Sequence, residues 1–160
     1  MNNDNSTKIF ATFSIVARCP KTLVLGVCVA TAVPAVGSVV PHVKSGVGAI
    51  ATQAYTNILY GIKGLKLLKM GFSPQTALEA MLKEDQEREQ RQVVIIDRDG
   101  KTAAFTGKNT IDWKGHLVGE NYVVAGNMLV GSKVIEAMAH TFEGSEGDLS
   151  ERLMKTLEAG

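Results

Sequence analysis

The stretch that decides the fold begins Thr-Phe-Ser-Ile-Val-Ala-Arg over residues Thr12–Arg18 and continues through Cys19–Lys21 into Leu23–Ala30. Side chains alternate between the two faces of a strand, and both faces here carry residues that tolerate burial. One face has Phe13, Ile15 and Ala17, and the other has Thr12, Ser14 and Val16. The proline in Cys19–Lys21 fixes φ and cannot donate to a sheet, so a turn is expected there. Leu23–Ala30 is rich in Val and Leu and is predicted to be the returning strand. A hairpin buried on both faces requires another layer on each side.

Helices are expected after a third buried strand over Val47–Gln53. Apolar residues three and four positions apart predict one helix over 58–70 and a second over 73–84. Ser73 suits the N-cap of the second helix and Pro74 its first position. Both signs of charge occur from Lys83 to Arg91, which predicts a solvated helix end and connection.

Strands resume with Val93–Asp97 and Thr102–Thr106, joined by an Asp-Gly turn that favours a hairpin. His116–Gly119 and Tyr122–Ala125 predict a further pair, and two helices follow over Ser132–Phe142 and Asp148–Glu158. Grouped strands and helices of this kind predict an α+β fold with two stacked sheets. The first helix pair is expected on one outer face and the C-terminal pair on the other.

Composition excludes several classes of protein. The chain has 160 residues, of which 45% are hydrophobic and 21% charged, which fits one compact domain. A net charge of +1 argues against nucleic-acid binding through a basic face. The apolar stretches are too short to cross a membrane. Residues 1–8 are polar and the apolar run after them is short for a signal peptide, so a cytoplasmic protein is expected.

Neither a metal nor another cofactor is expected. The three histidines, at positions 42, 116 and 140, lack the close spacing of zinc ligands. Two cysteines are too few for a disulfide framework, and Cys28 is expected to be a buried thiol. The chain also lacks a phosphate-binding loop, a dinucleotide fingerprint and a Gly-x-Ser-x-Gly nucleophile elbow.

A family resemblance goes further than these motifs. Seven segments carry it, in one order along the chain: 12–18, 35–41, 46–53, 88–92, 104–107, 113–116 and 126–129. With them the chain resembles the family of unknown function DUF1028, which is assigned to the N-terminal nucleophile (Ntn) hydrolase fold. The resemblance implies a four-layer αββα sandwich over residues 12–160, with residues 1–11 as a polar leader.

The chain departs from the family pattern at three places. Many relatives begin Met-Thr-Phe-Ser, whereas eleven residues precede Thr12 here. The first turn is usually Asp-Pro-x-Thr-Gly, and here it reads Cys-Pro-Lys-Thr-Leu. Relatives also continue past Gly160 with further strands, so the last strands of the sandwich are expected to be absent unless the chain itself continues. An unpaired sheet edge, together with apolar residues around much of Ser132–Phe142, predicts a twofold homodimer.

The resemblance implies that Thr12 is a catalytic nucleophile activated by its own α-amine, which requires Thr12 to be the first residue. Gln53, at a strand end, and Asn127, at a strand-to-helix corner, are candidate oxyanion donors. All three also suit ordinary roles, as a strand residue, a strand-end amide and a helix-entry cap. If the preceding residues stay attached, Lys44 is the alternative base, but it comes later in its loop than the usual lysine of this fold, and its ordinary alternative is a surface lysine.

Three further residues are candidates for substrate binding. Arg91 could hold a carboxylate, Trp113 could form a platform, and His116 could contact the substrate. Their ordinary alternatives are a surface or ion-pair role for Arg91, a core position for Trp113 and a strand-edge position for His116. The sequence therefore favours a hydrolase of an amide or related C–N bond in a small molecule, and the other hypothesis is a non-catalytic scaffold that binds a metabolite or a protein partner.

Overall fold

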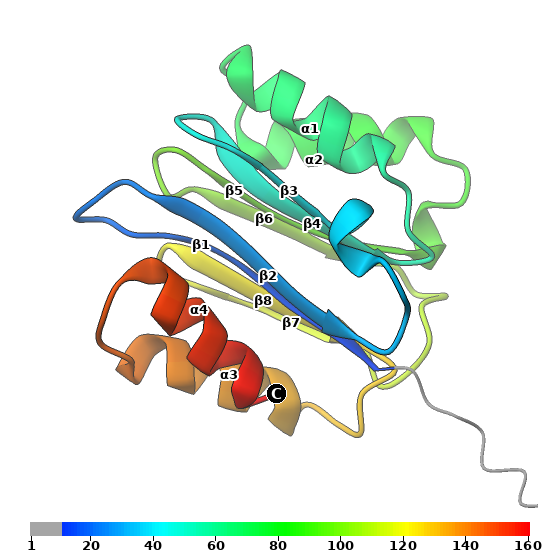
Figure 1. The fold of residues 1–160 in the computed structure, drawn as a ribbon. Helices are drawn as coiled ribbons and strands as arrows, with labels where there is room; N and C mark the ends of the chain where they lie inside the picture. The colour runs from blue at the N-terminus through cyan, green and yellow to red at the C-terminus, as the bar shows by residue number, and fades with distance from the viewer. Residues whose placement is uncertain (1–10) are drawn as a thin grey trace, which may run out of the picture.

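The computed structural model describes residues 11–160, so the predicted leader lies outside the described residues except for Ala11. Two four-stranded antiparallel sheets form the centre of the molecule (Figure 1). The first sheet has the order β2-β1-β8-β7, with β1 at Thr12–Arg18, β2 at Leu25–Thr31, β7 at Gly115–Gly119 and β8 at Tyr122–Asn127. The second has the order β3-β4-β5-β6, with β3 at Pro41–Lys44, β4 at Gly48–Ala54, β5 at Arg91–Asp97 and β6 at Thr102–Thr106.

Helix pairs cover the outer faces of the two sheets, as the grouping of elements predicted (Figure 1). Helices α1 (Leu59–Lys69) and α2 (Pro74–Glu84) pack on the second sheet through a core that includes Ile50, Leu78 and Ile95. Helices α3 (Lys133–Gly144) and α4 (Leu149–Glu158) pack on the first sheet. The predicted α+β class is therefore confirmed, with four α-helices and two antiparallel sheets among the described residues.

Between the sheets lies a third core, made of small and β-branched side chains. Its fully buried members come from the inner faces of β1, β4, β5 and β8 and include Val16, Ala49, Ala51, Val94, Ile96, Val123 and Ala125. Because side chains in a strand alternate, every second residue continues this inner face towards one end of the sandwich. At that end the inner face changes from apolar to polar.

Several predicted boundaries differ from the observed ones. Strand β3 was not among the predicted strands, and it begins at Pro41, because a residue without an N–H is tolerated at the first position of a strand. Strand β5 begins at Arg91 and β8 ends at Asn127, so each is two residues longer than predicted at the polar end. The prediction of a solvated segment from Lys83 to Arg91 is wrong at Arg91, which is 4% exposed.

The predicted N-terminal cap of α2 is observed, and α4 has a similar one. The Ser73 hydroxyl accepts a hydrogen bond from the Thr76 N–H at 3.1 Å, with Pro74 at the first helical position. Asp148 caps α4 in the same way, accepting from the Glu151 N–H at 3.0 Å. Each cap satisfies a donor that the helix itself leaves unpaired.

The apolar residues of α3 are accounted for within the chain. Ile135, Met138 and Phe142 are buried against the first sheet and α4, and Val134 packs on the same core. This removes one of the two arguments for a dimer, and the dimer itself stays a prediction. Cys28 is a free, half-buried thiol on this core, and burial raises its pKa. No helix within residues 11–160 has the length and hydrophobicity needed to cross a membrane.

Candidate functional site

Four polar side chains close one end of the core between the sheets. Thr12 on β1 lies directly opposite Asn127 on β8, and Gln53 on β4 lies directly opposite Gln92 on β5. All four stand in phase with the apolar residues of the inner face, so the two pairs face each other across the gap between the sheets. We call these four residues the amide layer. Their exposed fractions are 7% or less.

Gln92 is the centre of the amide layer. Its Nε2 lies 3.0 Å from the Gly115 carbonyl oxygen and 2.9 Å from that of Gly126. On its other side, Gln92 Oε1 accepts from Gln53 Nε2 at 2.7 Å and from Asn127 Nδ2 at 3.1 Å. One carboxamide therefore joins both sheets and both neighbouring amides.

These contacts fix the orientation of all three amides. Backbone carbonyls can only accept hydrogen bonds, so the –NH₂ group of Gln92 must face Gly115 and Gly126. Its Oε1 then faces Gln53 and Asn127, which must present their –NH₂ groups to it. The side-chain oxygens of Gln53 and Asn127 consequently point away from Gln92.

Neither of those two oxygens accepts a hydrogen bond from another group of the protein. Within residues 11–160, four buried side-chain polar atoms lack a partner, and three of them lie at this end of the sandwich: Ser14 Oγ, Gln53 Oε1 and Asn127 Oδ1. The fourth is Arg152 Nε. An unpaired buried polar group costs about 1–3 kcal/mol, so such atoms rarely gather in one place without a function.

Thr12 borders the same place. Its hydroxyl oxygen lies 2.8 Å from that of Thr31 on the neighbouring strand β2. Thr12 and Gln53 together line a small pocket of about 80 Å³, whose other walls include Val33, Val36, Val39 and Val40. We call this the valine pocket.

A second pocket adjoins the first at Ala54. It measures about 230 Å³, and Asn127 and Met128 contribute to its lining together with Tyr55, Gln90 and Ile111. Ala54 lines both pockets, so the strand end that follows Gln53 separates them. We call this second hollow the outer pocket.

Backbone strain accompanies the two amides with unpaired oxygens. Ala54 follows Gln53 and has a φ of 66°, and Met128 follows Asn127 and has a φ of 54°. This left-handed conformation costs conformational energy in any residue that has a Cβ, and such strain concentrates at functional sites. Strands β4 and β8 therefore change direction immediately after Gln53 and Asn127.

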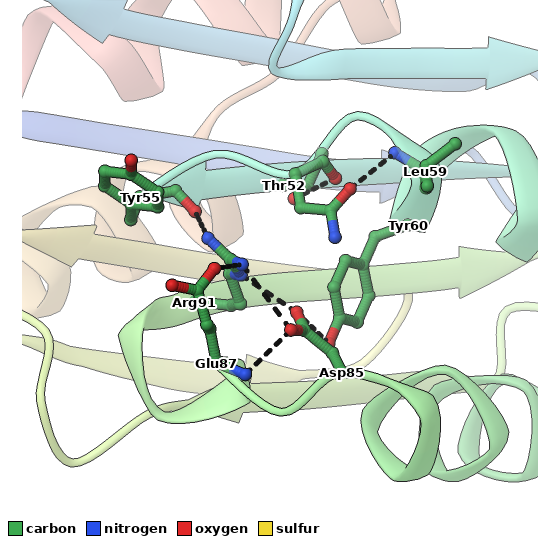
Figure 2. A network of polar contacts seen from close by, with 8 residues as sticks. Thr52, Tyr55, Leu59, Tyr60, Asp85, Glu87 and Arg91 are labelled. Atoms are coloured by element: carbon green, nitrogen blue, oxygen red, sulfur yellow. Dashed lines mark hydrogen bonds and ion pairs between the residues drawn. The ribbon is translucent and has the colours of Figure 1, made fainter.

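Arg91 anchors this turn from the opposite face of β5 (Figure 2). Its Nε donates to Asp85 Oδ2 at 2.9 Å, its Nη2 to Glu87 Oε2 at 2.7 Å, and its Nη1 to the Tyr55 carbonyl oxygen at 2.8 Å. The Arg91 hydrogen bond lowers the pKa of Asp85 to about 2. The guanidinium is thus occupied by groups of the protein, as the ion-pair alternative for Arg91 expected.

The Tyr60 hydroxyl completes these contacts, donating to Asp85 Oδ2 at 3.1 Å, and burial together with Asp85 raises the tyrosine pKa. We call Tyr60, Asp85, Glu87 and Arg91 the arginine network. Because Arg91 lies directly opposite Ala54 in the sheet, the network holds the strained strand end in place.

The remaining candidates lie around the site rather than in it. The Nδ1 of His116 is 2.8 Å from the Thr106 hydroxyl. That hydroxyl accepts a hydrogen bond from Gln92 Nε2 at 3.0 Å. Partial burial lowers the pKa of His116. Trp113 exchanges backbone hydrogen bonds with Leu129 and packs on the outer core of the first sheet. Lys44 is exposed opposite Gly48, at the far end of β4 from Gln53, and is not brought to Thr12.

Other hollows lie elsewhere on the molecule. One of about 390 Å³, at the opposite end of β1 and β8, contains Arg18, Glu120, Glu143 and Arg152. Another of about 170 Å³ lies beside the arginine network, at α1 and α2. Among the residues described, no three His, Cys, Asp or Glu side chains gather as metal ligands do. The amide layer differs from both hollows because its unpaired groups are neutral and fully enclosed.

Sequence reasoning missed Gln92, Thr31 and Ser14. The signal for Gln92 was present, because Gln92 stands in phase with Val94 and Ile96 on one face of the strand. Starting the strand at Val93 left Gln92 outside it. Ser14 was placed on the correct face with Thr12 and Val16, but a buried serine carries no sign of lacking a partner.

Comparison with known proteins identifies the family and supports the fold. The sequence pattern described as "Family of unknown function (DUF1028)" matches residues 12–160. The chain belongs to this family. A crystal structure of a DUF1028 protein, SPO2555 from Silicibacter pomeroyi, superposes with a TM-score of 0.90 at 33% sequence identity. The match covers 93% of this chain and 66% of that protein, so this chain spans less than two thirds of its length. No curated protein matches.

Proposed function

We propose that this DUF1028 protein, once Thr12 is its first residue, is an N-terminal nucleophile hydrolase that cleaves an amide or related C–N bond of a small molecule. The observation that carries the proposal is the position of Thr12. It begins β1 at the end of the sandwich where Ser14 Oγ, Gln53 Oε1 and Asn127 Oδ1 lie buried without partners. A Ntn-type αββα sandwich accounts for a nucleophile at the start of a central strand.

The reaction needs no group from outside the site except water. The free α-amine of Thr12, with a pKa of about 7.7–8.0, accepts the hydroxyl proton while Oγ1 bonds to the amide carbon. The C–N bond then breaks, and the departing nitrogen takes the proton, leaving an ester on Thr12. Water hydrolyses this ester, which releases a carboxylic acid and restores the hydroxyl and the amine.

Gln53 and Asn127 are suited to stabilise the oxyanion. Each –NH₂ group gives one hydrogen to Gln92 Oε1 and retains a second one. A preorganised donor at an oxyanion contributes about 3–4 kcal/mol of transition-state stabilisation. The rigid attachment of both amides to Gln92 removes the need to reorient them during the reaction. Substrate contacts of Arg91, Trp113 and His116, a cytoplasmic location and a twofold dimer stay predictions.

A non-catalytic binding protein is the second candidate, and one observation favours it. With residues 1–11 attached, the Thr12 nitrogen is part of a peptide bond and cannot accept a proton. Its hydroxyl is meanwhile paired with Thr31. A chain that keeps its leader would bind a small molecule at the amide layer without cleaving it.

The two candidates are separated by preparing three forms: the full chain, the chain beginning at Thr12, and that shorter chain with Thr12→Ala. Every described helix and strand is retained in all of them. A panel of small amides is followed by ammonia or amine release, and intact mass verifies each N-terminus. We expect turnover only in the form that begins with Thr12. Equal release by the Thr12→Ala form would overturn the hydrolase proposal.

A further inference from the structure

We infer that the site selects an uncharged amide whose acyl group is small and branched, and that it rejects the corresponding carboxylate. This deepens the proposed function, because it names the substrate class of the same site. It rests on the amide layer and the valine pocket, and its binding test does not require turnover.

Hydrogen-bond polarity is the first reason. Gln53 Oε1 and Asn127 Oδ1 are acceptors without donors, each on a residue that is 1% exposed. Beside each oxygen, the same side chain keeps one N–H that Gln92 does not use. The layer thus offers acceptors and donors together, which is the complement of an amide group with its own C=O and N–H. A carboxylate has no hydrogen to give, so it would leave both acceptors unpaired.

The absence of charge is the second reason. Within the described residues, the valine pocket and the outer pocket are lined by uncharged side chains alone. Arg91 is the only cation of the arginine network, and its guanidinium is held by Asp85, Glu87 and the Tyr55 carbonyl. In the full chain, where the Thr12 nitrogen is part of a peptide bond, a buried carboxylate would find no counter-ion here and would lose its hydration without compensation.

The size and chemistry of the valine pocket identify the acyl group. A volume of about 80 Å³ holds only a few non-hydrogen atoms. Four valines form much of its wall, with Thr12 at its edge to attack the carbonyl carbon of an acyl group seated there. A group such as isopropyl fills this space and buries its methyl groups. The leaving amine would then extend past Ala54 into the outer pocket, which is larger.

The same polarity favours release of the product. Hydrolysis replaces an N–H donor with a carboxylate oxygen, so the acid formed no longer matches Gln53 Oε1 and Asn127 Oδ1. The unpaired acceptors therefore match the substrate group and not the group that the reaction makes.

Isobutyramide and isobutyrate are the matched probes, since they differ only in –NH₂ against –O⁻. Their dissociation constants are measured at pH 7 by NMR titration of the full chain, in which Thr12 has no free amine and cannot turn over the amide. We expect isobutyramide to bind at least tenfold more tightly than isobutyrate. Equal affinities, tighter binding of isobutyrate, or no binding of either probe because water alone fills the site would overturn the inference.

A variant pair tests the role of the oxygens. Gln53→Met removes an acceptor at similar volume and should reduce the preference for isobutyramide to less than threefold. Tyr60→Phe, which alters only the arginine network, should leave the preference unchanged. The comparison of probes on the unaltered chain does not depend on either variant folding.

Failure of this inference is distinguishable from failure of the proposed function. Selective isobutyramide binding without turnover by the chain that begins at Thr12 would support the inference and contradict the hydrolase. Turnover of amides with a charged acyl group, such as succinamate, at a rate equal to that of isobutyramide would support the hydrolase and overturn the inference.

Discussion

The amide layer and the arginine network are two polar clusters on opposite faces of the second sheet, and both meet it at the ends of β4 and β5. Gln53 and Gln92 point from β4 and β5 towards the first sheet, whereas Arg91 belongs to the network beside α1 and α2. The network is charged, and its guanidinium, carboxylate and phenol are paired with one another. The amide layer is neutral and leaves two acceptor oxygens unpaired.

Under the proposed function, this difference separates a structural cluster from one that binds a ligand. A cluster whose groups satisfy one another stabilises the fold and has nothing left to offer a ligand. A cluster with buried, unpaired polar groups lowers the stability of the fold. A ligand that forms hydrogen bonds with those groups can recover the lost stability. Removing parts of the network should therefore cost stability, and removing parts of the amide layer should cost binding instead.

The largest stability effect is expected from Arg91→Met. The change leaves Asp85, whose side chain is 12% exposed, without its partner, and it frees the Tyr55 carbonyl. Breaking a buried ion pair in this way costs about 3–5 kcal/mol, measured as the free energy of unfolding in urea. Lys63→Met is the control, because its pair with Glu84 is exposed and should change stability by less than about 0.5 kcal/mol. A loss below about 1 kcal/mol for Arg91→Met would contradict the role of the network.

Acid should weaken the network through Asp85. Arg91 lowers the pKa of this carboxyl from 3.8 to about 2, so its stabilising contribution is complete above about pH 4 and is lost as the pH falls to about 2. The shift corresponds to about 2 kcal/mol. Urea unfolding between pH 5 and pH 2 should therefore show a smaller loss of stability in Asp85→Asn than in the unaltered chain. Identical losses would show that the pair contributes nothing.

A gain in stability is expected from Ser14→Ala. The Ser14 hydroxyl is fully buried on the inner face of β1 and has no partner, so alanine removes a polar atom that is not satisfied. We expect the free energy of unfolding to rise by about 1 kcal/mol, measured as a higher urea midpoint with an unchanged dependence of that free energy on urea concentration. Thr156→Val is a matched control, because the Thr156 hydroxyl donates to the Arg152 carbonyl, and its removal should be neutral or destabilising. A loss of stability in Ser14→Ala would mean that the hydroxyl is paired.

The smallest stability change is expected from Gln53→Met. It removes one hydrogen bond to Gln92 and also one unpaired oxygen, and the two effects nearly cancel. We expect a change within about 1 kcal/mol in urea unfolding, alongside the loss of amide preference described above. A destabilisation as large as that of Arg91→Met would place Gln53 among the structural residues.

The sequence predicted the helix and sheet layers better than the side-chain contacts between them. Hydrophobic spacing located the helices because burial of one face determines it, and alternation located Thr12 and Ser14 on the same side of β1. It could not show that Gln53 and Gln92 meet Asn127, since that depends on how two sheets stack. It also described Arg91 as one residue of a charged run, because nothing local distinguishes a solvated arginine from one that is buried among Asp85, Glu87 and a carbonyl.

Covalent labelling of Thr12 tests the central claim most directly. A small β-lactone is incubated with the chain that begins at Thr12, and the site of addition is mapped by peptide mass spectrometry. Attack by Oγ1 opens the ring and adds the whole mass of the lactone. We predict one adduct, on the peptide that begins with Thr12, and its suppression by excess isobutyramide. No adduct, or an adduct at another residue such as Cys19 with Thr12 unmodified, would contradict the account.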